Sequence, residues 1–364
     1  MYSESDVQSA VTAGAISAEA AQALRDHVAR INASPAVDEE QFRLITGFND
    51  IFVTIACLLV IFAAAAVGKP LPLAACSGIF VAIAAWAMAE AFTRKRRMAL
   101  PSIVLLIAFV VGLGLAVLSG LEQAIPQHRL VEYYDYAGER QRYESWQHHP
   151  WQIAVMQIAA AAAAGIGALL HWRRFHVAIT IAAAVAALTL FVLASVAALR
   201  NQPWDDNALI APAALICGIG VFAYAMWWDM SDRARTTQRS DIAFWLHLVA
   251  APLIAHPLFH WMGVTSGESI SMVTAIGVLA IYVGFAAIAL AVDRRALLVS
   301  ALAYVLIALA QLFQLYGAVE LNVALTALVI GSALLALSAW WQIIRRRIMQ
   351  LFPESVQARL PPVG

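Results

Sequence analysis

The chain has 364 residues, of which 62% are hydrophobic and 13% are charged, and its formal net charge is zero. Soluble domains carry roughly 45–50% apolar residues and about 25% charged residues. This composition excludes a soluble globular enzyme and a disordered chain. Because there is no surplus of basic residues to neutralise phosphates, it also excludes a nucleic-acid binder. We therefore expect an all-α, polytopic transmembrane bundle.

Residues 1–48 are expected to form a small cytosolic helical module. They are not a signal peptide, because no short apolar segment follows basic residues. Gly14 suits the end of a first helix, and Ser17 suits the N-cap of a second. A third, amphipathic piece from Asp38 to Phe48 leads into the first span, where its apolar side chains could lie in the headgroup layer.

Ten segments are long and apolar enough to cross a bilayer, which requires about 20 mostly apolar residues. They are residues 50–68, 71–92, 100–119, 151–170, 177–198, 208–228, 242–262, 270–292, 296–317 and 322–344. We expect them to form a bundle over residues 49–347, with a cytosolic tail at residues 348–364.

The distribution of Lys and Arg predicts the orientation of this bundle. If residues 1–48 lie inside, the inner connections and the tail hold 15 basic residues, and the outer connections hold 5. Cytoplasmic loops of membrane proteins carry such an excess. Ten spans with both ends cytoplasmic therefore fit the sequence, and in a bacterium this means the inner membrane.

The long outer connection at residues 120–150 has its own pattern. Aromatic and β-branched residues on both sides of Gly138 predict a small β-hairpin. The hairpin could cap a cavity as a lid. We favour a solvated interfacial loop, anchored by Tyr133, Tyr134, Trp146 and Trp151 in the aromatic belt.

The cysteines and the acid within a span point to structural roles. Cys57, Cys76 and Cys217 lie in apolar runs and are expected to be small packing residues, so neither a disulfide nor a thiolate metal site is indicated. The acid that we place inside a span is Glu90. It lies one turn before Arg94, so an i, i+4 ion pair near the inner surface explains it.

The seventh expected span, residues 242–262, contains Pro252 and Pro257. Each proline removes a backbone donor, so we expect a kink or a break between about residues 248 and 257. Transporter sites are often built on such helices. His256 and His260 follow one another at i, i+4 in the same segment.

This histidine pair has two interpretations. The spacing suits two ligands of one metal ion, and His148 and His149 at the outer mouth of the fourth span could add to them. No glutamate of a metalloprotease motif accompanies the pair, however. We favour histidines that hydrogen-bond freed carbonyls or neighbouring helices, and we assign no metal.

Further intramembrane polar residues gather in the outer half of the spans. Gln311 and Gln314 lie in the ninth span, with Tyr304 one heptad before Gln311, and Gln157 lies in the fourth. Together with His256 and His260 they predict a polar pocket that opens to the outside and is lined by spans four, seven and nine, with Gln314 and Gln157 as secondary members. The alternative is a set of interhelical hydrogen bonds, each worth about 0.6 kcal/mol. The sequence leaves both open.

Three segments resemble those of a group of uncharacterised bacterial polytopic inner-membrane proteins, which carry a small N-terminal helical module and a domain of unknown function. The segments are Gly14–Ser17, Asp38–Phe52 and Phe244–Pro257. The resemblance implies a bacterial inner-membrane protein. It implies no activity, substrate or catalytic residue.

We therefore expect a non-enzymatic protein that binds or moves a small solute or ion, with the lipid bilayer as its other partner. One alternative is a membrane scaffold or sensor that docks partners through residues 1–48, and another is an intramembrane metalloenzyme. No cofactor is indicated, and a homo-oligomer is compatible with the sequence. Proton coupling is not favoured because no acid is placed near the midplane, although His247 or His256 could titrate.

Overall fold

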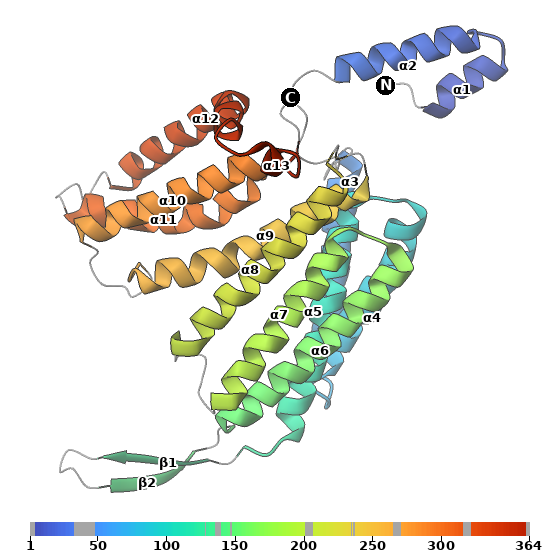
Figure 1. Ribbon diagram of the computed structural model, residues 1–364. Helices are drawn as coiled ribbons and strands as arrows, with labels where there is room; N and C mark the ends of the chain where they lie inside the picture. The colour runs from blue at the N-terminus through green and yellow to red at the C-terminus, as the bar shows by residue number, and fades with distance from the viewer. Residues whose placement is uncertain are drawn as a thin grey trace. The chain divides into compact units, whose positions relative to one another are not determined.

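The computed structural model describes residues 4–32, 48–127, 129–134, 140–145, 148–200, 207–233, 235, 237–264, 271–315 and 322–361. The chain divides into two compact units (Figure 1). The first comprises Met1–Glu39 with Val363–Gly364, and the second comprises Glu40–Pro362.

The first unit contains two helices that pack against each other, α1 (Glu4–Thr12) and α2 (Ala18–Asn32). Gly14 between them has a φ of +70°, a conformation that glycine adopts without strain. The Ser17 hydroxyl accepts a hydrogen bond from the Ala20 N–H at 3.1 Å. The predicted helix stop and N-cap are therefore confirmed. The amphipathic piece expected from Asp38 to Phe48 lies outside the described residues, except for Phe48, where α3 begins.

The second unit is built from long apolar helices, and each expected span overlaps one of them. They are α3 (Phe48–Gly68), α4 (Cys76–Ala89) with a π-helical continuation η1 (Glu90–Lys95), α5 (Ala99–Ala124), α6 (Pro150–Phe175), α7 (Ile179–Arg200), α8 (Asn207–Ser231), α9 (Gln238–Trp261), α10 (Met272–Val292), α11 (Ala296–Leu315) and α12 (Asn322–Met349), followed by the short α13 (Glu354–Gln357).

Within the described residues, nine helices are long and apolar enough to cross a membrane. These nine do not include α11, which overlaps the expected span 296–317. The chain is thus a multi-pass helical membrane protein. Its three cysteines are free thiols on membrane-spanning helices, and Cys57 is buried.

The connection between α5 and α6 forms the predicted hairpin. Strands β1 (Arg129–Tyr134) and β2 (Arg140–Ser145) pair antiparallel, with Arg129 opposite Ser145 and Tyr134 opposite Arg140. The hairpin itself is confirmed. Its role, as a lid or as an interfacial loop, is still a prediction.

Small residues allow neighbouring helices to approach closely. A Cβ atom added to Gly78 of α4 would lie 2.5 Å from the carbonyl oxygen of Gly112 on α5. A Cβ atom added to Gly218 of α8 would lie 2.9 Å from the Cβ of Leu253 on α9. Small residues serve this purpose in membranes, where helices gain no hydrophobic energy by leaving lipid for one another.

Helix α9 is the most buried candidate span, with half of its residues inside the protein. One part of it packs with α7 and α8 through Leu246 and Ala250. The next part packs with α11, and its Ala255 and Phe259 belong to a core cluster shared with α10, α11 and α12. The helix continues through both prolines, so a break is contradicted, and a kink at these positions stays a prediction. A proline removes only one backbone donor, and the helices packed along α9 hold it in place.

Polar contacts connect helix ends that the alternation of spans places on the same side. Arg174 at the end of α6 donates two hydrogen bonds to Glu90 of η1, at 2.7 and 3.1 Å, and Arg94 adds the predicted i, i+4 pair at 3.2 Å. At the opposite side, Gln123 near the end of α5 hydrogen-bonds the segment before α4, at 2.7 Å to the Ala74 N–H. The ends of α4, α5 and α6 therefore alternate as those of antiparallel neighbours do.

Candidate functional site

A polar cluster joins α9 to α11 in the half of the spans where a pocket is expected. His256 Nδ1 lies 2.8 Å from the hydroxyl of Tyr304. The His260 ring follows one turn later on α9, with its centroid 6.1 Å from that of His256. Phe259 stacks on Tyr304 at 4.8 Å. His256 is exposed and His260 is half-buried, so this cluster is accessible from outside the helix pair.

The other predicted pocket residues are distributed more widely. Gln311 and Gln314 belong to α11, but their side chains lie outside the described part of the structure. Gln157 is half-buried on α6, which packs mainly on α5 and α7. On α9, Pro252 is exposed and Pro257 is buried.

The additional histidines at the outer mouth have partners of their own. His148 Nε2 lies 3.2 Å from the carbonyl oxygen of Ile125, and the His149 N–H donates to the Gln152 side chain at the start of α6. No group of three or more His, Cys, Asp or Glu side chains suited to hold a metal occurs among the described residues.

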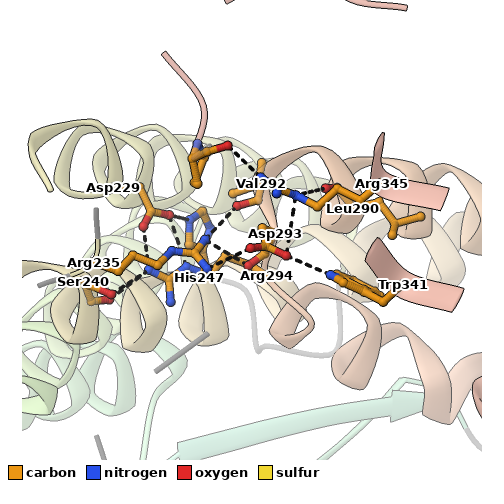
Figure 2. Close-up of polar contacts among 11 residues, drawn as sticks. Asp229, Arg235, Ser240, His247, Leu290, Val292, Asp293, Arg294, Trp341 and Arg345 are labelled. Atoms are coloured by element: carbon orange, nitrogen blue, oxygen red, sulfur yellow. Dashed lines mark hydrogen bonds and ion pairs between the residues drawn. The ribbon is translucent and has the colours of Figure 1, made fainter. Parts of the chain in front are cut away.

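A second polar cluster, which the sequence analysis did not predict, lies at the opposite ends of these helices (Figure 2). Its first part centres on Asp229 of α8. Arg294 Nη2 donates to one carboxylate oxygen at 2.5 Å, and Arg294 Nε donates to the other at 3.3 Å. His247 Nε2 on α9 lies 2.9 Å from the second oxygen. Arg294 also donates to the Ser240 carbonyl at 3.0 Å. We name these four residues the Asp229 centre.

The second part centres on Asp293, in the turn after α10. Arg235 donates to one carboxylate oxygen at 3.0 Å, and the indole N–H of Trp341 on α12 donates to the other at 2.8 Å. Arg345 Nε, also on α12, lies 3.6 Å from that second oxygen. We name Asp293, Arg235, Trp341 and Arg345 the Asp293 centre.

The turn between α10 and α11 supplies both centres because its backbone is left-handed at Asp293, where φ is +59°. The Asp293 N–H still donates to Ala289, which closes the helix. Aspartate adopts this conformation more readily than most residues. The reversal directs Asp293 to one centre and Arg294 to the other (Figure 2).

The segment after α13 closes this cluster from the other direction. Arg345 Nη2 donates to the Pro361 carbonyl at 2.7 Å, and Arg233 Nε donates to the Leu360 carbonyl at 3.1 Å. Both Leu360 and Pro361 are buried.

Charges in the two centres are deeply buried and mutually compensating. Arg294 and His247 are fully buried, Arg345 is 1% exposed, and Asp229 is 2% exposed. Asp232 is also buried and accepts hydrogen bonds from the Thr237 N–H and hydroxyl at 2.9 and 2.7 Å. An isolated buried charge costs several kcal/mol, and this cost is offset only by good pairing. The arrangement can therefore hold charge inside the protein or exchange it.

The sequence analysis missed this cluster because it placed the boundary of the sixth span at residue 228. Helix α8 continues to Ser231, so Asp229 is an acid within a candidate span, which the expected boundary had left outside. Arg235, Arg294 and Arg345 were treated as basic loop residues. His247, inside an apolar run and titratable, was the one available signal.

No protein-family model, no characterised protein and no solved structure matches this chain. The resemblance to bacterial inner-membrane proteins of unknown function therefore remains a proposal.

Proposed function

We propose that this chain is a ten-span protein of a bacterial inner membrane, with both ends cytoplasmic, and that it binds or moves a small solute or ion. The contact of Arg345 on α12 with the Leu290 carbonyl near the end of α10 supports the tenth crossing. Helix α12 ends where α10 ends, so α11 must return the chain to the opposite side. The excess of basic residues in the inner connections supports the orientation.

The observation that carries the solute-binding proposal is the His256–Tyr304 contact between α9 and α11. Imidazole and phenol groups both donate and accept hydrogen bonds, so together they suit a small polar solute. Gln311 follows Tyr304 by seven residues in α11, which is the spacing of one stripe along a helix. The pocket proposed here opens to the outside.

Thiol accessibility tests the pocket. Cys57, Cys76 and Cys217 are replaced by Ala, His260→Cys is introduced, and intact cells receive a membrane-impermeant thiol reagent. We expect prompt labelling, because a water-filled pocket admits the reagent. Ile276→Cys is the matched control. Ile276 is an exposed apolar residue in the outer part of α10, where lipid should exclude the reagent.

The result that would overturn the pocket is an unreactive residue 260 in cells where Ser145→Cys in β2 reacts normally. His256 and Tyr304 would then be a hydrogen bond between helices. The metalloenzyme alternative is separated by elemental analysis of the purified protein, since it alone requires bound metal.

One observation favours a second candidate function, a scaffold or sensor. Helices α1 and α2 belong to a compact unit of their own, as a docking module would. This function predicts that deleting residues 1–33 abolishes activity in cells, whereas His256→Ala and Gln311→Ala have no effect. The solute-binding function predicts the reverse.

A further inference from the structure

The geometry at Asp229 fixes the tautomer of His247. The Asp229 carboxylate accepts two hydrogen bonds from Arg294 and is therefore ionised. An ionised carboxylate can only accept, so His247 Nε2, at 2.9 Å, must carry a proton and donate it. In the neutral ring, Nδ1 then bears a lone pair. This atom is buried and has no hydrogen-bond partner among the described residues.

We propose that the Asp229 centre is a proton-binding site, with Nδ1 of His247 as the atom that takes up the proton, and that this proton is the coupling ion for the solute pocket at His256. On uptake the Nδ1 lone pair forms an N–H bond, while Nε2–H keeps its hydrogen bond to Asp229. The imidazolium produced faces the carboxylate that stabilises it. The coupling part of this inference rests on the proposed function.

The groups around His247 determine its affinity for a proton. Asp229 from α8 favours the imidazolium, whereas Arg294 from the α10–α11 turn and Arg235 from the α8–α9 connection oppose it. On α9 itself, Asp241 lies about two turns earlier. Phe222 of α8 places its ring 5.1 Å from the imidazole, in a T-shaped contact.

The other helices that pack against α9, which are α7 and α11, carry few charged residues. Helix α7 carries a single charged residue, Arg200, at its last position, and α11 carries none, with Tyr304 as its titratable group. Arg294 is therefore the charged group that shares the Asp229 carboxylate with His247.

Coupling follows from where the partners lie in the chain. Helix α9 carries both His247 and His256, nine residues and about 14 Å apart along the axis. Arg294 lies two residues before α11, and Tyr304 lies within α11. One shift of α11 along α9 would change both the Arg294–Asp229 pair and the His256–Tyr304 pair. A proton on His247 and a solute at His256 would thus bias the same movement, and their effects must be reciprocal.

A purely structural role explains less. Arg294 already neutralises Asp229 through two hydrogen bonds, so the ion pair does not require a histidine. The buried Nδ1 without a partner among the described residues still calls for an explanation, and a binding position for a proton supplies one.

The first test is a titration of the full-length protein in lipid nanodiscs, labelled with ¹⁵N-histidine and followed by NMR. The chain has nine histidines, and the signal lost in His247→Gln identifies this residue. We expect its Nδ1 to change from acceptor to N–H as the pH is lowered. Asp229→Asn should weaken proton binding by roughly tenfold or more, because the stabilising carboxylate is gone.

In Arg294→Gln, the pH midpoint of the His247 titration should shift in the opposite direction, because a positive charge that repels the imidazolium is removed. This variant provides a readout if Asp229→Asn does not fold. The proton site would be overturned if the His247 signal of the wild-type protein does not titrate while other histidines do. This outcome requires only the variant His247→Gln, which assigns the signal.

The second test addresses coupling. The labelling rate of His260→Cys from outside is measured at pH 6 and pH 8, with His247 intact and with His247→Gln. At each pH, the labelling rate with His247 intact is divided by the rate with His247→Gln. This ratio cancels the intrinsic pH dependence of the thiol's reactivity. We expect this ratio to change by about fivefold or more between the two pH values.

Each outcome has a distinct meaning. An unchanged ratio together with a titrating His247 overturns the coupling and retains the proton site. No labelling in either background overturns the proposed function, while the NMR titration still decides the proton site.

Discussion

At the scale of single residues, two arginines of α12 show how much position matters. Arg345 is 1% exposed and contacts the Leu290 carbonyl, the Pro361 carbonyl and Asp293. Arg347, two residues later, is exposed. In the count of basic residues that predicts the orientation, each of these two arginines counts as one positive charge. Removing a partner from a buried pair leaves a charge uncompensated, whereas an exposed arginine is solvated with or without a partner.

This difference gives a matched prediction. Arg345→Ala should lower the free energy of unfolding by about 3–5 kcal/mol, and Arg347→Ala should change it by less than about 0.5 kcal/mol. The free energy is measured by denaturant titration of the purified protein in detergent. Equal effects of the two substitutions would contradict the buried Asp293 centre.

The neighbouring tryptophans allow a second comparison. Trp341 is buried and donates to Asp293 at 2.8 Å, and Trp340 is 57% exposed. Trp341→Phe keeps an aromatic ring under Arg295, which lies 4.9 Å from the Trp341 ring, but it deletes the N–H. We expect a loss of about 1–3 kcal/mol from the unsatisfied acceptor. Trp340→Phe should have almost no effect in the same unfolding assay, and a loss as large as that of Trp341→Phe would count against the hydrogen bond.

At the scale of elements, close packing between helices depends on single glycines. Gly78→Ala would place a Cβ atom 2.5 Å from the Gly112 carbonyl oxygen, so α4 and α5 must separate. We expect destabilisation by about 1–3 kcal/mol. Gly220 of α8 has no atom within 4 Å of an added Cβ. Gly220→Ala should therefore be neutral or stabilising by up to about 1 kcal/mol, since alanine favours the helix. Thermal unfolding of both variants measures the difference, and a harmless Gly78→Ala would contradict the tight α4–α5 contact.

The elements themselves were largely predictable, because their signals are local. Each expected span overlaps a helix, and the residues around Gly138 form a hairpin. The Gly14 stop and the Glu90–Arg94 pair were readable for the same reason. The continuity of α9 was not, because packing by α7, α8 and α11 decides what two prolines do, and this packing is not encoded within the helix.

The Asp229 and Asp293 centres were not predictable for a different reason. Their partners are separated along the chain, with 65 residues between Asp229 and Arg294 and 58 between Arg235 and Asp293. Each residue taken singly is an ordinary charge near the end of a span. The sequence analysis predicted that polar residues of spans seven and nine lie in the same half of the bundle. The structure adds the contact between His256 and Tyr304.

At the scale of the whole molecule, the spans fix which residues share a side of the membrane. The ten crossings proposed above would put the tail after α12 on the side opposite to the hairpin. We expect Ser145→Cys in a cysteine-free chain to react with an impermeant thiol reagent in intact cells. Ser355→Cys in α13 should react only after permeabilisation. The inverse pattern would reverse the orientation. Reaction of both residues in intact cells would mean an even number of crossings between β2 and α13, so that not all seven helices from α6 to α12 cross, as when α11 does not.

The paired charges also have an order in time, because a ribosome makes them one after another. His247 emerges 18 residues after Asp229, whereas Arg294 emerges 65 residues after it. At about 5–20 residues per second, the carboxylate waits roughly 3–13 s for its guanidinium. During that interval, of its two side-chain partners, only His247 has been synthesised to hydrogen-bond the Asp229 carboxylate. Arg233 waits longest, since the Leu360 carbonyl lies 127 residues further on. The nascent chain therefore holds Asp229 without its arginine while α9 and α10 are being made, and the carbonyls of Leu360 and Pro361 add the last hydrogen bonds, to Arg233 and Arg345.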